Sequence, residues 1–70
     1  MILQWQNNQA SLNGGTIRIV FDEAQRPVEL VYISDGTVWF RRDLDGCDIA
    51  AAQDIAEAFA RSLMWLDSLR

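Results

Sequence analysis

Asp35-Gly36 is the residue pair that most constrains how this chain folds. Aspartate followed by glycine between two alternating stretches is typical of a two-residue type I′ hairpin, because both turn residues adopt positive φ. The stretches 28–34 and 37–42 flank this pair and are predicted to be the two strands of the hairpin. A turn of fixed length also fixes the register of its strands. The predicted cross-strand pairs are Ile33 with Val38, Tyr32 with Trp39, Val31 with Phe40 and Leu30 with Arg41.

Further strands are expected before this hairpin. Residues 16–22 alternate and are rich in β-branched side chains, which favours a strand. The stretch 13–15 is a turn signal because its two glycines accept positive φ. Residues 2–6 are predicted to form a short first strand, and residues 7–12 either continue it through a bulge or form a loop. The sequence therefore predicts an antiparallel meander with strands at about 2–6, 16–22, 28–34 and 37–42.

From Asp48 onward the apolar residues recur every three or four positions, which is the period of a helix. Asp48 is the predicted N-cap, since its carboxylate can accept hydrogen bonds from the first free amides. Glu57 and Arg61 are expected to pair on the exposed side of this helix. The predicted core stripe is Ala52, Ile55, Ala56, Phe59, Leu63 and Leu66. The expected fold class is α+β: a single domain, 1–70, with a four-stranded antiparallel meander sheet and one C-terminal α-helix, about 48–69, packed on one face.

Composition limits the partners and the compartment. The chain has 70 residues, half of them apolar, which suits one small folded domain. Its formal net charge is −4 and its six basic residues are all arginine, which argues against direct nucleic-acid binding. The single cysteine, Cys47, cannot form an internal disulfide, and no apolar run reaches the roughly 20 residues that cross a bilayer. We therefore expect a cytoplasmic protein without a signal peptide or membrane contact.

No motif predicts catalysis, a metal or a cofactor. The chain lacks histidine and lysine, so acid–base chemistry would fall to carboxylates or Tyr32, and no carboxylate pair is evident. Cys47 has no histidine to activate it. The aspartates of residues 43–48 could offer oxygen ligands to calcium, but their spacing departs from the EF-hand loop, and a strand-to-helix turn explains the same residues. We expect a non-enzymatic protein.

One helix can cover only one face of the predicted sheet, so the other face stays wet or meets another chain. The side chains expected under the helix are those of Ile17, Ile19, Phe21, Val31, Ile33, Val38 and Phe40. The opposite face is expected to hold Arg18, Val20, Leu30, Tyr32, Trp39 and Arg41. Antiparallel sheets often keep some apolar side chains in water. Trp, Tyr and Arg are nevertheless the usual anchors of protein interfaces, so we predict that this face binds a protein partner or a second copy in a homodimer.

Four further residues are predicted to contribute to partner binding as a secondary site: Asp43, Asp45, Met64 and Trp65. Asp43 and Asp45 form a local acidic run before the helix, while Met64 and Trp65 lie outside its apolar stripe. The last two residues either cap the core beside Trp5 or, if exposed, form an anchor pair for a partner groove.

Part of the chain follows the layout of a known family. Asp35-Gly36 leads into a strand, then into the turn 43–47, and then into a helix with Ala56, Ala60 and Trp65. In this order residues 33–69 resemble the N-terminal core of HicB-type antitoxins. Arg42 and Asp45 stand where that family has prolines, and the family's threonine-glutamate helix start is absent. The resemblance implies an antitoxin that neutralises a ribonuclease toxin.

In size, acidity and lack of catalytic residues, the chain is also similar to phage-encoded anti-CRISPR and anti-restriction inhibitors. That resemblance implies an inhibitor that blocks a host nuclease or effector complex sterically, which is the leading expectation. The alternatives are the HicB-like antitoxin and a structural homodimeric subunit of a phage or mobile element.

Overall fold

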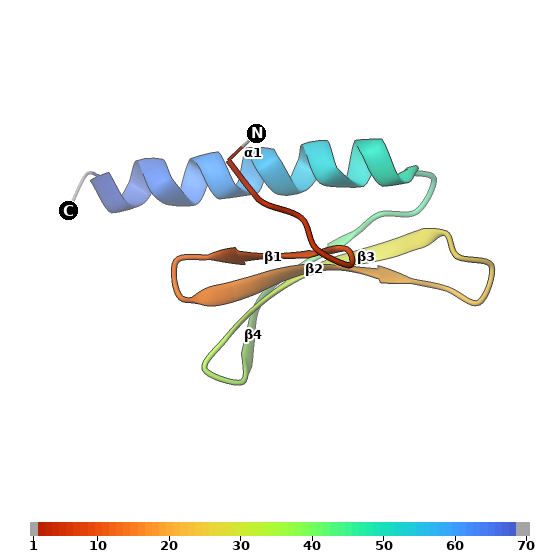
Figure 1. The fold of residues 1–70 in the computed structure, drawn as a ribbon, viewed down its shortest axis with the longest axis horizontal. Helices are drawn as coiled ribbons and strands as arrows, with labels where there is room; N and C mark the ends of the chain where they lie inside the picture. Colours follow the sequence, from red (N-terminus) through yellow and green to blue (C-terminus); the bar gives the residue numbers. More distant parts are fainter. Residues whose placement is uncertain (1, 69–70) are drawn as a thin grey trace.

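The computed structural model of this protein describes residues 2–68, with side chains as far as residue 65. Its elements are β1 (Gln9–Leu12), β2 (Gly15–Phe21), β3 (Pro27–Ser34), β4 (Thr37–Asp43) and α1 (Ile49–Ser68). The strands form one antiparallel sheet in the order β1-β2-β3-β4, and α1 lies over one face of it (Figure 1). This confirms the predicted α+β class. The helix α1 lacks the apolar length that a membrane-spanning helix needs.

The first strand begins later than predicted. Residues 2–6 are not a strand, because the chain reverses at Asn7 and Asn8, whose φ values are 52° and 64°. Asparagine tolerates this left-handed region better than most residues. Gln6 and Gln9 exchange backbone hydrogen bonds of 2.8 and 3.1 Å across this reversal. The other strands and the helix start within about one residue of their predicted positions, while the predicted helix end at Leu69 lies outside the described residues.

Glu57 holds the segment that precedes β1. Its side chain is only 3% exposed, and its two carboxylate oxygens accept the backbone N–H groups of Ile2 at 2.9 Å and Leu3 at 3.0 Å. The N-terminal segment accordingly runs beside α1 before it reaches the sheet (Figure 1). The predicted placement of Glu57 on the exposed helix face, paired with Arg61, is therefore wrong. The segment closes one side of the core.

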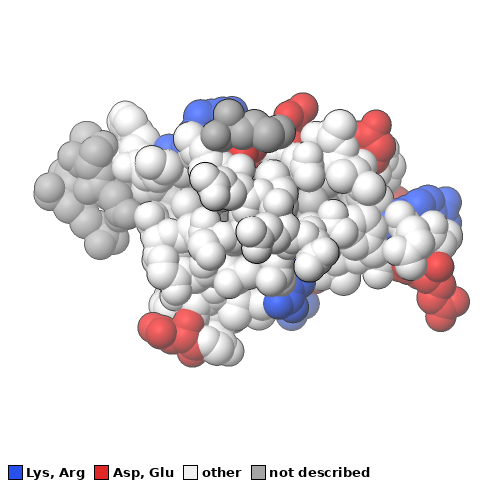
Figure 2. All heavy atoms as spheres, viewed as in Figure 1, with Lys and Arg blue, Asp and Glu red and all other residues white. Residues whose placement is uncertain are grey.

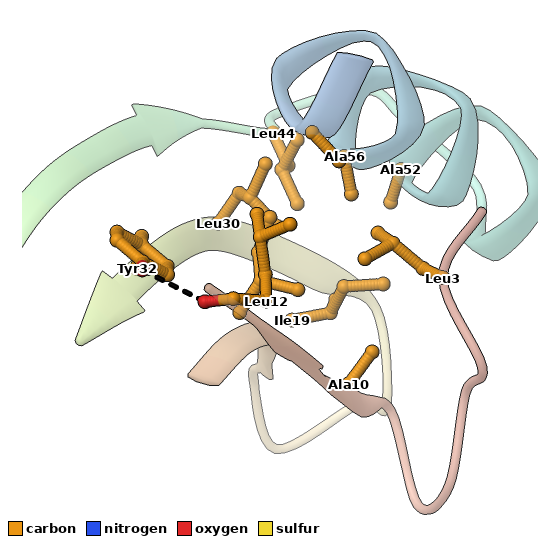
Figure 3. Packing of buried hydrophobic residues seen from close by; sticks show 11 residues of the cluster. Leu3, Ala10, Leu12, Ile19, Leu30, Tyr32, Leu44, Ala52 and Ala56 are labelled. Carbon is orange, nitrogen blue, oxygen red and sulfur yellow. Dashed lines mark hydrogen bonds between the residues drawn. The ribbon is translucent and has the colours of Figure 1, made fainter. Parts of the chain in front are cut away.

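The helix approaches the sheet closely because small side chains line the contact. Ala52, Ala56 and Ala60 lie four residues apart and are fully buried. Asp48 is the N-cap as predicted, since its Oδ1 accepts the N–H of Ala51 at 2.7 Å. The buried cluster comprises Leu3, Ala10, Leu12, Ile17, Ile19, Leu30, Tyr32, Leu44, Ala52, Ala56 and Ala60 (Figure 3). Its partly buried neighbours include Ile55, Phe59 and Leu63, whereas the side chain of Leu66 is not described.

Candidate functional site

The register between β2 and β3 decides which side chains reach solvent. Ile17 lies opposite Tyr32 and Ile19 lies opposite Leu30. Residues directly opposite in an antiparallel pair share a face, so all four lie beneath α1. Tyr32 is only 8% exposed, and its hydroxyl donates a hydrogen bond to the Leu12 carbonyl (Figure 3). The prediction that Leu30 and Tyr32 belong to an exposed face is wrong.

A bulge in β4 changes the predicted pairing of the hairpin. The two-residue turn and the pair of Ile33 with Val38 form as predicted, but the register then shifts by one residue. Phe40, not Trp39, lies opposite Tyr32, which leaves Trp39 as the extra residue of the bulge. The predicted Tyr32–Trp39 pair is therefore wrong. Phe40 points toward the helix, as predicted, while Ile33 and Val38 share the other face.

The face turned away from α1 carries two arginines, Arg18 and Arg41, and several branched apolar side chains. Val31 lies between Arg18 of β2 and Arg41 of β4 in the register. The Arg18 guanidinium donates a hydrogen bond of 3.2 Å to the side-chain oxygen of Gln9. Of the residues predicted for this face, the structure brings together Arg18, Val20 and Arg41. Three apolar residues predicted to lie under the helix are on this face instead: Val31, Ile33 and Val38. Val31 is nevertheless buried, as predicted, at 6% exposure.

Trp39 has the most exposed large apolar side chain among the described residues, at 69%. Its Nε1 donates a hydrogen bond of 3.1 Å to the Ser34 carbonyl, which restrains the indole against the start of the turn. Val38 beside it is also exposed, and the hairpin bends away from α1, so its tip projects from the molecule (Figure 1). A restrained aromatic side chain loses less rotamer freedom on binding than a mobile one. Trp39 is thus suited to be an interface anchor.

The two edges of the sheet differ in how far they are open. β1 has four residues, and Gln9 in it pairs back to Gln6 of the preceding turn. The shallow hollow beside this edge is lined by Ile2, Gln4, Gln6, Gln9, Ala10, Ser11 and Thr16. β4 is longer, with seven residues, and no described segment pairs with its outer edge.

On the face seen in Figure 2, charged side chains lie around the rim and a broad uncharged area lies between them.

A groove of about 390 Å³ separates β4 from α1 where the strand and the helix diverge. In it the rings of Phe40 and Phe59 stack with centroids 4.3 Å apart and planes inclined by 18°. The groove is lined by Phe40, Arg42, Ile55, Ala58, Phe59 and Ser62. Arg41 and Arg42 are exposed, and neither guanidinium has a hydrogen-bond or ion-pair partner among the described residues.

The secondary site predicted from the sequence does not form one cluster. Met64 and Trp65 are 48% and 63% exposed in the later turns of α1, so they do not cap the core, whereas Trp5 packs half-buried against it. Asp43 ends β4, and its Oδ1 accepts the N–H of Asp45 at 3.0 Å. The acidic pair therefore lies before the start of the helix and the apolar pair near the other end.

A hollow of about 800 Å³ lies between the β2–β3 connection and the start of α1. Two of the carboxylates that line it serve local turns: Asp22 accepts the N–H groups of Ala24 and Arg26, and Asp48 caps α1. Among residues 2–68, no three cysteine or acidic side chains gather as metal ligands. The local hydrogen bonds of Asp22 and Asp48 therefore account for the presence of these two carboxylates beside the hollow.

The class that these observations define is a small α+β domain in which one helix covers one face of a four-stranded meander and β4 forms an open edge. No family model matches the sequence, and the comparisons with curated proteins and with solved structures returned no match.

Proposed function

We propose that this protein is a small non-enzymatic inhibitor that binds a host nuclease or effector complex and blocks it sterically. The observation that carries the proposal is the exposed, hydrogen-bonded indole of Trp39 at the tip of the β3–β4 hairpin. Tryptophan and arginine are the residues most enriched among interface anchors, and β4 presents Trp39 together with Arg41 and Arg42. Arg18, which lies in register with Val31 and Arg41 on the face turned away from α1, extends the same surface.

The size of the chain is compatible with this role. A standard interface buries about 800 Å² on each partner. That is about a sixth of the 4949 Å² that this chain exposes, so one side of the molecule provides enough contact area. An inhibitor of the anti-CRISPR type needs no chemistry of its own. It needs a surface that competes with the substrate or with a subunit of the target.

Affinity capture from a bacterial host lysate tests the proposal. The wild-type chain is expected to retain a nuclease or effector subunit, and Trp39→Ala should weaken that binding by more than about 1 kcal/mol. Ile49→Ala is the matched control, because Ile49 is an exposed apolar residue beyond the other end of β4. The nuclease activity of the captured complex should fall to its minimum at one chain per site. Equal losses in the two variants, or no partner at all, would contradict the proposal.

The second candidate is an antitoxin like those of the HicB type. It is supported by the Asp35-Gly36 turn, whose residues have φ values of 53° and 74°, and by the full burial of Ala56 and Ala60 in the helix that follows. An antitoxin should have a small basic ribonuclease encoded beside it and should co-purify with that toxin. An isolated gene whose product captures an unrelated effector would count against this candidate.

A further inference from the structure

β4 offers backbone hydrogen-bonding groups along its outer edge. The N–H of Leu44 donates to the Val28 carbonyl of β3 at 3.0 Å, so the alternate residues Arg42 and Phe40 also pair inward. The N–H and C=O groups of Arg41 and Asp43 therefore point away from the sheet. An extended chain that lies beside β4 could bond to all of them, as in other complexes where a peptide adds a strand to a sheet edge.

A strand added there would also bring alternate side chains into the groove between β4 and α1. The positions opposite Phe40 and Arg42 lie on the helix side of the sheet. The stacked rings of Phe40 and Phe59 provide an apolar wall in this groove, next to the small side chain of Ala58. The groove therefore suits one large apolar side chain of the added strand, opposite Phe40.

Arg41 and Arg42 determine which charge the added strand carries. As neighbours in a strand they point to opposite faces, and neither has a partner among the described side chains. A carboxylate opposite each would form a charge-assisted pair, whereas Asp43 disfavours a third carboxylate at the next position. We infer that the partner supplies an extended segment in which two consecutive acidic residues stand beside a large apolar residue, and that this segment pairs with β4 as a fifth strand. The inference deepens the proposed inhibitor function and rests on it.

A second copy of the chain fits this edge less well. Two-fold antiparallel pairing centred on Arg41 places that arginine opposite itself, and like charges directly opposite are unfavourable. Pairing centred on Arg42 sets each Arg41 opposite an Asp43 but still places Arg42 opposite itself, a repulsion that an acidic segment does not have. Pairing centred on Phe40 avoids this, but it requires the bulged half of β4, where Trp39 interrupts the regular edge of both strands. Charge complementarity therefore favours an acidic segment of another protein.

The test uses the full chain, immobilised, and a displayed library of random twelve-residue peptides. The selected peptides should share two adjacent acidic residues next to a large apolar residue. The affinity of the best peptide should fall about tenfold or more with Arg42→Glu, since the variant replaces a charge-assisted contact by a repulsive one. Arg61→Glu is the matched control, because Arg61 is exposed on α1 and does not line the groove. A selected pool without the acidic pair would overturn the inference.

The predicted backbone hydrogen bonds between β4 and the added strand are tested by comparing Arg41→Pro with Arg41→Ala. Both remove the guanidinium, but only proline removes the outward N–H, which the sheet itself does not use. Proline is expected to weaken peptide binding about fivefold more than alanine, the value of one hydrogen bond. Independently of these variants, amide exchange at Arg41 and Asp43 of the wild-type chain should slow when the peptide is added. Equal affinities for the two variants, or unchanged exchange, would show binding through side chains alone and contradict strand pairing.

Failure of the inference is distinguishable from failure of the proposed function. If the captured effector depends on Trp39 but is insensitive to Arg41→Pro and Arg42→Glu, strand pairing is wrong and the inhibitor function stands. If acidic peptides are selected but no effector is captured, the inhibitor function is wrong and strand pairing stands. Sedimentation that shows a dimer lost in Arg41→Pro would identify a second copy as the occupant and overturn the inference.

Discussion

The hydroxyl of Tyr32 donates a hydrogen bond of 2.8 Å to the backbone carbonyl of Leu12. The two residues belong to β3 and β1, which are separated in the sheet by β2. The Tyr32 ring therefore extends across β2 at Gly15, where a Cβ atom would come within 2.8 Å of the hydroxyl oxygen. This contact places Tyr32 in the core and excludes it from any docking surface.

Tyr32→Phe should lower the free energy of unfolding by about 1 kcal/mol, because it removes one buried hydrogen bond and preserves the ring. Urea unfolding measures this change. Ser62→Ala is the matched control: its exposed hydroxyl bonds to the Ala58 carbonyl, and its removal should change stability by less than about 0.5 kcal/mol. The binding of a protein partner should be unaffected by Tyr32→Phe. A loss of affinity similar to that of Trp39→Ala would contradict the placement of this ring.

Gly15→Ala should destabilise the protein more than Gly14→Ala. A Cβ at Gly15 would lie 2.6 Å from the Ile33 carbonyl oxygen, and this backbone atom cannot move aside cheaply. We expect a cost of about 2 kcal/mol or more from overpacking. Gly14 has a φ of +80° and open space around it, so alanine there should cost about 1 kcal/mol for the left-handed conformation. Thermal unfolding of the two variants decides the order, and a reversed order would contradict the close packing at Gly15.

Local signals in the sequence were sufficient for three of the strands and the helix, but not for the first strand or for the faces of the sheet. The Asp35-Gly36 turn, the Asp48 cap and the helical stripe each depend on residues within a few positions. The turn and the cap form as predicted, and the stripe does so as far as Leu63, the last of its residues with a described side chain. The run 30–33 is apolar on both faces, so its sequence does not reveal which side is buried. A one-residue shift then exchanged Leu30 and Tyr32 with their neighbours. Nothing in the sequence marks the bulge that places Trp39 outside the regular pairing.

The role of Glu57 was beyond local reasoning for a different reason. Its i,i+4 neighbour Arg61 is a plausible partner on a helix, and the sequence offers no sign of another. The groups that it binds are the main-chain amides of Ile2 and Leu3, 55 and 54 residues away. Such long-range contacts with the backbone depend on the fold as a whole, so no periodicity or motif indicates them.

Glu57→Gln should loosen the N-terminal segment. One oxygen of the buried carboxylate becomes an NH₂ group that faces a backbone N–H, so one of the two hydrogen bonds is lost and the freed donor stays poorly solvated. We expect a loss of about 2 kcal/mol in stability. Amide exchange at Ile2 and Leu3 should accelerate more than exchange in β3. Asp54→Asn, at an exposed position of α1, is the control that should leave both quantities nearly unchanged. Unaltered protection at Leu3 in Glu57→Gln would refute the role of the carboxylate.

Asp22 makes the β2–β3 connection sensitive to acid. Its Oδ1 accepts the N–H groups of Arg26 and Ala24, each at 2.9 Å, and its Oδ2 lies 3.5 Å from the Arg26 Nε. The hydrogen bond from the Arg26 amide, and then the charge of Arg26, lower the pKa of the Asp22 carboxyl below 3.8, against an opposing effect of desolvation. Because the pKa is lower in the folded state, the stabilisation is complete above the unfolded pKa and disappears as the pH falls through the folded value.

We therefore expect an NMR titration of the Asp22 carboxyl carbon to show a midpoint below 3.8. Amides in the turn, such as that of Ala24, should shift with the same midpoint, because their hydrogen bonds weaken when the carboxylate is protonated. Asp22→Asn should abolish this transition in the turn, whereas Glu23→Gln, at the exposed neighbouring position, should preserve it. A midpoint at or above 3.8 would mean that the charged form of Asp22 gains nothing from these contacts, so the turn would owe its shape to the backbone alone.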